Sequence, residues 1–220
     1  MPAQVKSHVP SGRVLWSLLE DTFVDGDGDA LTVHGRWGSI EVSDTSPVVR
    51  EALQRMSLGP VALENISWLH ENHASWTSGT PADLPGSCRA WRRLKLTLDS
   101  LGGFVVPSLG LKNGAGPILS VVAIVGDPVF RLPHAHRSAR IGLRKRSEIQ
   151  GLNGDQALTC PEMAYQVVLH RSPAPEIARL LLDSDSTAAA VAESLQLDPC
   201  LVDDVVAYFA GAGLLTVTDG

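Results

Sequence analysis

The sequence predicts an α+β fold built from two similar units, each a β-hairpin followed by three helices in a winged-helix-like arrangement, with a further β-hairpin segment joining them. Two observations predict it. The stretch DGDALT, which begins at Asp27, and the stretch NGDQALT, which begins at Asn153, share Ala-Leu-Thr, and the numbers of the two alanines differ by 157 − 30 = 127. In both copies an alternation of apolar residues follows, as in a half-buried strand, and then a helix start. The order of elements therefore repeats, and not only three letters.

The first copy contains a second strand and two well-marked helices. Ile40 lies on the strand, and a helix is predicted to begin at Pro47, with Thr45 or Ser46 as its cap. The helix is expected to bury a stripe formed by Val49, Ala52, Leu53 and Met56. After a polar loop, a further helix is predicted from Cys88 onward, rich in arginine on one side.

The second copy repeats this order with clearer boundaries. Val167 takes the position of Ile40, since 40 + 127 = 167, and a helix follows Pro173. A short helix is predicted from Ser186 or Thr187, and Asp198 caps the last one. The last helix is expected to bury Leu201, Val202, Val205, Val206 and Phe209.

Between the copies, two apolar runs flank the turn KNGAGP, which begins at Lys112, and predict a β-hairpin. We therefore expect a first unit over 13–103, a β-rich connector over 104–150 and a second unit over 151–218.

Composition narrows the class of protein. The net charge of −6 argues against a protein built to bind nucleic acid or an anionic membrane over its whole surface. No apolar stretch reaches the length of a membrane span, and the N-terminus has no secretory pattern. The three cysteines lie far apart, which predicts neither a disulfide framework nor a zinc site. We expect a cytoplasmic protein without a membrane partner.

No reactive motif passes a test of spacing. The acidic run at 25–29 resembles the start of a calcium loop, but Ala30 and Arg36 stand where that loop needs glycine and glutamate. His70 with His73, and His134 with His136, lack a third metal ligand in the sequence. We therefore expect no catalytic residue, no metal site and no cofactor in this chain, and predict a binding protein rather than an enzyme acting alone.

Two binding modes remain open at this stage. A recognition helix could enter DNA, but the last helix carries two aspartates and no cation, so nucleic acid is disfavoured there. Basic residues elsewhere form a candidate patch for an acidic partner. On the first copy's last helix the alternative is DNA, and in the connector the alternative is a solvated surface. They are Arg89, Arg92, Arg93 and Lys95 on the first copy's last helix, and Arg140, Arg144, Lys145 and Arg146 in the connector.

The other mode is the addition of an extended peptide to a strand edge. In the second copy, the strand Tyr165–His170 is expected to be an edge strand that faces the last helix. The candidate peptide-binding residues are Tyr165, Gln166, Val168 and His170 on the strand, and Leu201, Asp204, Val205 and Tyr208 on the helix.

The second copy resembles the PqqD-like recognition element that binds leader peptides in ribosomal peptide biosynthesis. The hairpin that begins NGDQALT, the helix pair LLDSDSTAAAVAESL and the ending VVAYFAGAGLL carry this resemblance. The stretches RWGSIEV, LGGFVVPSL, GPILSVV and YQVVLHRSPAPEIARLLL are also similar to the N-terminal half of SagB-type azoline dehydrogenases. These resemblances cover most of residues 13–217.

The resemblance implies a role beside a flavin enzyme. Members of that family continue into an FMN-binding domain, which oxidises azolines to azoles, and nothing in this sequence resembles it. The expectation is a non-catalytic recognition or scaffold subunit, with FMN on a partner protein or on a missing domain. Its expected partners are a precursor leader peptide, a flavin-dependent dehydrogenase and, as a further candidate, a cyclodehydratase. A winged-helix DNA-binding regulator is the alternative.

Overall fold

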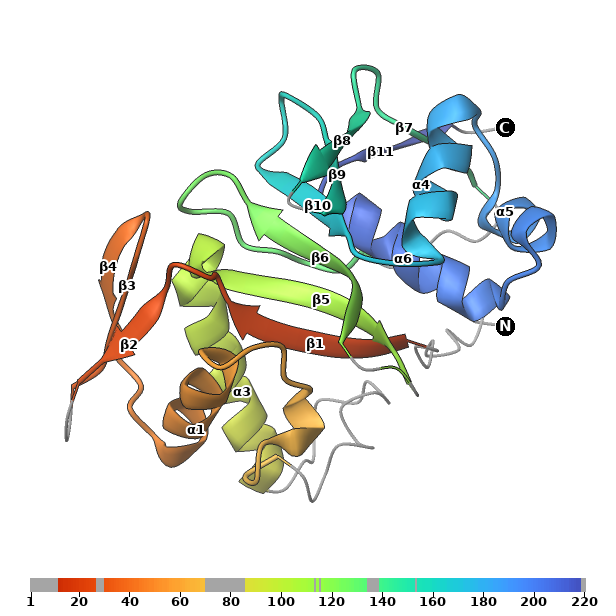
Figure 1. Cartoon of the computed structure of the whole chain (residues 1–220). Helices are drawn as coiled ribbons and strands as arrows, with labels where there is room; N and C mark the ends of the chain where they lie inside the picture. The colour runs from red at the N-terminus through yellow and green to blue at the C-terminus, as the bar shows by residue number, and fades with distance from the viewer. Residues whose placement is uncertain are drawn as a thin grey trace, which may run out of the picture.

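The computed structural model describes residues 12–26, 30–69, 86–112, 114, 116–133, 139–152 and 154–218. In this part of the chain the fold is mixed α and β, with five α-helices and antiparallel sheets, so the α+β class is confirmed (Figure 1). The two histidine pairs considered above, at 70 and 73 and at 134 and 136, lie outside the described residues.

The elements follow one another along the chain with short connections. The strands are β1 (Gly12–Leu18), β2 (Phe23–Asp25), β3 (Thr32–Gly35), β4 (Gly38–Glu41), β5 (Val105–Leu111), β6 (Pro117–Ala123), β7 (Arg140–Leu143), β8 (Glu148–Leu152), β9 (Asp155–Thr159), β10 (Tyr165–Leu169) and β11 (Leu215–Thr218). The helices are α1 (Pro47–Met56), α3 (Gly86–Leu101), α4 (Ala174–Asp183), α5 (Ala188–Leu195) and α6 (Pro199–Gly211), with short 3-10 turns η1 (Leu63–Asn65) and η3 (Gly102–Phe104).

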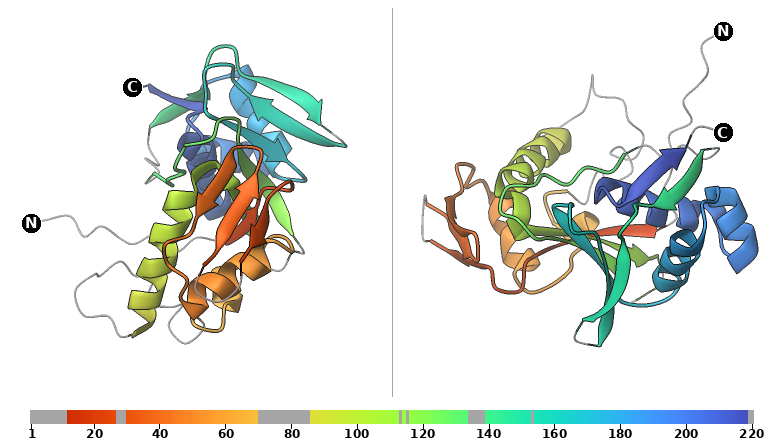
Figure 2. Two further views of the ribbon diagram at one scale, coloured as in Figure 1. Left: turned by 90° about the vertical axis from the view of Figure 1, so that its left-hand side faces the viewer. Right: turned by 90° about the horizontal axis from the view of Figure 1, so that it is seen from above.

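A six-stranded antiparallel sheet in the order β1-β5-β6-β10-β9-β8 connects the two halves of the chain. The predicted hairpin of the connector is β5 and β6, which lie at the centre of this sheet. A three-stranded sheet, β2-β3-β4, belongs to the first half, and the pair β7 and β11 belongs to the second. Figure 2 shows α1 and α3 gathered on the first half and α4, α5 and α6 on the second.

The two halves repeat the same order of elements and the same strand pairing. Helix α1 spans 47–56 and α4 spans 174–183, and both boundaries keep the offset seen in the sequence, since 174 − 47 = 127 and 183 − 56 = 127; residues 13–16 of β1 likewise correspond to β7 at 140–143. In each half the first strand pairs with the strand that follows the last helix, β1 with β5 and β7 with β11. The next strands form a meander, β2-β3-β4 in one half and β8-β9-β10 in the other. The repeat seen in the sequence is therefore a structural duplication.

The register within the meanders differs between the halves. The offset aligns Leu31 and Thr32 with Leu158 and Thr159. Thr32 begins β3 and Leu31 directly precedes it, whereas Leu158 and Thr159 lie at the end of β9. The offset therefore holds for β4 with β10 and for α1 with α4, but β9 is shifted by two residues relative to β3 in its pairing.

Helix starts follow the sequence signals. The Thr187 hydroxyl accepts a hydrogen bond from the Ala190 N–H at 3.2 Å, and the Asp198 carboxylate accepts one from the Cys200 N–H at 2.9 Å. Pro47 takes the first turn of α1 without a side-chain cap.

Each half has its own hydrophobic core. The first core contains the α1 stripe together with Leu94 and Phe104, and the second contains Val167 and Phe209. Strand β6, which follows the first half in sequence, buries its inner face in the second core. This packing of β6 in the second core decides which strand edges are covered at the candidate site described next.

Candidate functional site

Strand β10, where the sequence predicts an open edge for a peptide, lies inside the six-stranded sheet. Tyr165 pairs with Ala123 of β6 on one side, and Val167 pairs with Leu158 of β9 on the other. The expectation of an open edge at Tyr165–His170 is therefore wrong, because β6 already occupies that edge.

The other candidate residues on β10 are also buried, partly buried or hydrogen-bonded within this chain. Val168 is buried and Gln166 is partly buried. The backbone N–H of His170 donates to the carbonyl oxygen of Ile118 at 2.9 Å, which continues the ladder with β6. On α6, Leu201 packs against the second core.

The candidates on α6 fasten strands of the first half. The Asp204 carboxylate accepts a hydrogen bond from the Gly12 N–H, at the start of β1, at 2.8 Å. The Tyr208 hydroxyl donates to the carbonyl oxygen of Ser108 on β5 at 2.9 Å, and Val205 is fully buried. These side chains hold the two halves together and do not line a free peptide surface.

Both tyrosines of the chain are expected to titrate above the usual range. Burial raises the pKa of the Tyr165 phenol to about 12, and burial together with the Asp204 charge raises the pKa of Tyr208 further. Because the folded protein keeps protons that the unfolded chain releases near pH 10, the free energy of unfolding is steady below about pH 10 and falls as the pH rises toward about 12. Ultraviolet absorbance should therefore show little tyrosinate in the native protein at about pH 11. A native titration midpoint near that of free tyrosine would contradict this burial.

The first half leaves open the edge that β6 fills in the second half. Strand β4 corresponds to β10 through the same sequence offset, and it pairs with β3 on one side only, within the described residues. Its residues Gly38, Ser39 and Glu41 are exposed, and Ile40, which faces the first core, is partly buried. An exposed edge of this kind presents unpaired backbone groups to solvent.

The hydrogen-bond register of β4 matches that of β10. Val42 donates its N–H to the carbonyl oxygen of Leu31 at 2.8 Å, so by the alternation of an antiparallel ladder Ile40 also bonds toward β3, and Ser39 and Glu41 point their backbone groups outward. In the second half, the even-numbered residues of β10 bond toward β6, as the His170 contact shows.

The residues of β4 that point their backbone groups outward correspond in the repeat to the residues of β10 that bond to β6. Adding 127 to 39 and to 41 gives 166 and 168, and Gln166 and Val168 are the residues of β10 that bond toward β6. Ser39 and Glu41 therefore offer an incoming strand the same pattern of donors and acceptors that β10 offers to β6.

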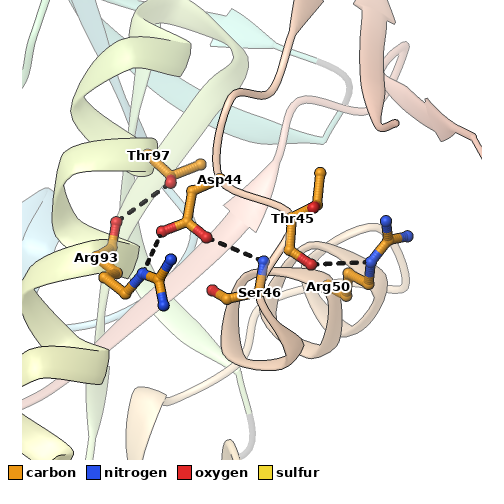
Figure 3. A network of polar contacts seen from close by, with 6 residues as sticks. All are labelled: Asp44, Thr45, Ser46, Arg50, Arg93 and Thr97. Atoms are coloured by element: carbon orange, nitrogen blue, oxygen red, sulfur yellow. Dashed lines mark hydrogen bonds and ion pairs between the residues drawn. The ribbon is translucent and has the colours of Figure 1, made fainter. Parts of the chain in front are cut away.

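Two contacts relate helix α3 and the turn η3 after it to the residues that flank β4. At one end, Gly35 packs so closely against η3 that a Cβ atom there would lie 3.1 Å from the Phe104 ring. At the other end, Arg93 on α3 donates to the Asp44 carboxylate at 2.8 Å, and Figure 3 shows Asp44, just beyond β4, pointing at the helix. Gly35 pairs with Gly38, the first residue of β4, so the chain from Gly38 to Asp44 runs from the C-terminal end of α3 toward its middle.

A small polar network fixes the exit from β4. The second oxygen of Asp44 accepts a hydrogen bond from the Ser46 N–H at 2.9 Å, directly before α1 begins. Burial acts to raise the pKa of the Asp44 carboxyl, but hydrogen bonds from Ser46 and the hydrogen bond and charge of Arg93 outweigh it, so this pKa lies below its usual range. The carboxylate therefore stays ionised at neutral pH and keeps α3 beside the end of β4.

The predicted basic patch is divided between the two halves. Arg89 and Arg92 are exposed on α3, whereas Arg93 pairs with Asp44 and Lys95 pairs with Asp99 one turn further along α3. The connector residues lie around β7 and the turn after it, in the second half. There Arg140 donates to the Asp185 carbonyl oxygen, Arg144 to the Gly213 carbonyl oxygen, and Arg146 pairs with Glu162, while Lys145 is exposed. The structure thus does not bring the two groups together into one surface.

A row of polar side chains crosses the sheet next to β10. The Ser108 hydroxyl donates to Ser120 on β6 at 2.8 Å, the Ser120 oxygen lies 2.8 Å from Nε2 of His170, and Nδ1 of His170 lies 2.8 Å from the Asp155 carboxylate. This is the atom order of a Ser–His–Asp triad.

The burial of this row contradicts a nucleophilic role. Ser120 is 6% exposed and Ser108 is fully buried, whereas the side chains of His170 and Asp155 are 27% and 39% exposed. A triad needs the reverse, with an accessible serine and a shielded aspartate. Ser120 also pairs with residues on both sides in the sheet. The row is better explained as a side-chain hydrogen-bond network that connects β6 to β9 and to the end of β10.

The described residues contain no group of three or more histidine, cysteine or acidic side chains placed to hold a metal ion. Cys160 is buried and Cys200 is partly buried. None of the helices described is long and apolar enough to cross a membrane.

Comparison with known protein families found no family model that matches this chain, and a comparison with curated proteins found no match either. The function is therefore inferred from the site itself.

Sequence reasoning missed Ser39 and Glu41, because it searched for a peptide edge only in the second copy, where the helices were better marked. The available signal was β6. Its sequence PILSVVA is apolar on both faces, which is typical of a strand with both faces covered, as in the interior of a sheet. A strand in the interior of a sheet needs a neighbour on each side, and besides β5 the neighbour of β6 is β10.

Proposed function

We propose that this chain recognises a precursor peptide by strand addition to β4, as a non-catalytic recognition and scaffold subunit of a flavin-dependent azoline dehydrogenase system in ribosomal peptide biosynthesis. The observation that supports it most is the open edge of β4, whose counterpart β10 already carries an antiparallel strand in the same register. The first half therefore keeps as a binding edge what the second half uses for folding.

The proposal includes a tandem winged-helix-like organisation. Each half has a three-stranded antiparallel meander followed by helices, and the second half has three helices in sequence, α4, α5 and α6. This order is what the resemblance to PqqD-like recognition elements implies. Peptide recognition of this kind uses main-chain hydrogen bonds for affinity and neighbouring side chains for specificity.

The flavin chemistry is assigned to another polypeptide or domain. The sequence contains no glycine-rich motif that would cradle a phosphate, so FMN does not fit a motif of this chain, and no reaction step is derived through it. The partners in this proposal are a flavin-dependent dehydrogenase and, as a further candidate, a cyclodehydratase, in the cytoplasm. The role of this chain would be to hold the peptide near the enzyme and so raise its local concentration.

The structure changes the case against the alternative, a DNA-binding regulator: one observation against it no longer applies, and another takes its place. Asp203 and Asp204 on α6 are 4% and 6% exposed, so they do not repel phosphate at the surface as the sequence suggested. However, α6 is itself buried against the sheet, and on α3 the cations Arg93 and Lys95 are paired with carboxylates. Only Arg89 and Arg92 are exposed on α3 without an ion pair to another described residue, which is few for a recognition helix.

A binding titration tests the proposal. A leader segment of an azoline-type precursor peptide would be labelled with a fluorophore, and its polarisation measured as the chain is added. We expect saturable binding that persists when salt is raised, because main-chain bonds carry most of it. Absence of leader binding, together with binding to duplex DNA that weakens steeply with salt, would overturn the proposal in favour of the regulator.

A further inference from the structure

The strand β6 shows what kind of segment the open edge accepts. It lies antiparallel on β10, with Leu119 and Val121 pointing into the second core and Ser120 on the opposite face. Because β4 presents the same register, an added peptide is expected to run antiparallel to β4 and to place alternate apolar side chains toward the first core. Ile40 of β4 marks that inner side.

The last helix of the first half, α3, has a different charge from the last helix of the second half, α6. Helix α6 contains no lysine or arginine, and its two aspartates are buried. Helix α3 carries Arg89, Arg92 and Arg93 in its N-terminal half, all exposed. One turn further, Leu96 is 62% exposed, so the outer surface of α3 changes from basic to apolar along its length.

The direction of the peptide relative to this surface follows from two contacts that flank β4, at Gly35, which pairs with the first residue of β4, and at Asp44, just after its end. Because β4 runs from the C-terminal end of α3 at Phe104 toward Arg93, the helix and β4 are antiparallel. A peptide antiparallel to β4 is therefore parallel to α3. Its N-terminal part would pass the arginines, and its C-terminal part would pass the apolar end, where Trp37 packs beside Gly126.

The acidic side chains near β4 restrict where peptide charge is tolerated. Asp44 is paired with Arg93, and Glu41 lies on the outer face of the sheet, opposite to Ile40. An acidic residue of the peptide next to Glu41 would be repelled, whereas one that lies beyond the end of β4, beside Arg89 and Arg92, would be attracted.

We infer that the recognised peptide is an extended segment whose acidic residues precede its alternating apolar residues, with the acidic part beside Arg89 and Arg92 and the apolar part along β4. This inference rests on the proposed function, because it specifies the ligand of the same edge. The ligand class is an acidic peptide, and the arginines of α3 set its direction and charge.

Designed peptides test the inference. The first probe is the β6 sequence ILSVVA preceded by a run of glutamates; the second has lysines in place of the glutamates, and the third has the glutamates after ILSVVA. All carry the same fluorophore. We expect the first probe to bind the full chain about tenfold more tightly than either of the others, since rim charges of this kind attract or repel across an interface. Raising the salt concentration should narrow this difference.

Matched variants test whether Arg89 and Arg92 cause the preference for the first probe. Arg89→Glu combined with Arg92→Glu should remove the preference for the first probe, whereas Lys112→Glu, which reverses an exposed charge in the turn after β5, should retain it. Equal binding of all probes, with the precursor leader still bound, would overturn the inference and leave strand addition standing. Tightest binding of the third probe would reverse the assigned direction. Failure of the leader and of every probe to bind would overturn the proposed function itself.

Discussion

Replacing Glu41 with proline is expected to weaken peptide binding by about tenfold or more while leaving the fold intact. The N–H of Glu41 points away from β3, so its loss removes no bond of the meander. Proline would remove a donor that an added strand needs and leave a peptide carbonyl unsatisfied, which costs about 1–3 kcal/mol. Since a loss of about 1.4 kcal/mol weakens binding tenfold, this cost gives the expected loss of affinity.

The matched control is Glu41→Ala, which removes the same carboxylate but keeps the N–H. It should bind peptide at least as well as the unaltered chain, because it removes only a negative charge next to the edge. Circular dichroism and thermal unfolding would show that both variants fold. If Glu41→Pro binds the leader as tightly as Glu41→Ala, the peptide does not add to β4.

Replacing Leu119 with alanine is expected to lower the free energy of unfolding by about 2–5 kcal/mol, as for other large-to-small changes in a core. Leu119 is fully buried on β6 and packs in the second core, so its effect measures how firmly β6 belongs to the second half. Urea denaturation monitored by fluorescence would measure the change.

The neighbouring residue Val122 provides the control on the same strand. Val122 is partly buried and points to the face opposite Val121, so Val122→Ala should cost well under half as much as Leu119→Ala. If Leu119→Ala costs no more than Val122→Ala, β6 is a loosely held linker, and the edge of β10 would be available to a peptide after all.

Local signals in the sequence were enough to locate most elements. The Pro47 start of α1, the Thr187 and Asp198 caps and the hairpin around KNGAGP were all found, because caps and turns act over three or four residues. The duplication was also visible, since the constant offset relates the boundaries of α1 to those of α4.

Pairing between distant strands was beyond these signals. Whether β10 is an edge depends on β6, more than forty residues earlier, and alternation along one strand does not say which strand lies next to it. The two aspartates of α6 were misjudged for the same reason. As a sequence they look like a solvated acidic face, but Asp204 is buried because it accepts the N–H of Gly12, 192 residues away in the chain.

The arginines of α3 show how much of the candidate site could be predicted from the sequence. Their helix and their spacing followed from the sequence, but not the strand that lies beside them. The contact between Arg93 and Asp44 shows that α3 lies beside the segment just after β4, and no pattern within either segment encodes it.

Amide hydrogen exchange with and without the leader peptide tests strand addition to β4 most directly. The N–H groups of Ser39 and Glu41 should exchange quickly in the free chain and become protected on binding, while that of Ile40, already bonded to β3, should change little. Protection that appears at Ser39 and Glu41 alone in the meander would confirm the assigned edge. Binding that leaves both amides unprotected would show that the peptide is held elsewhere and would contradict the proposed site.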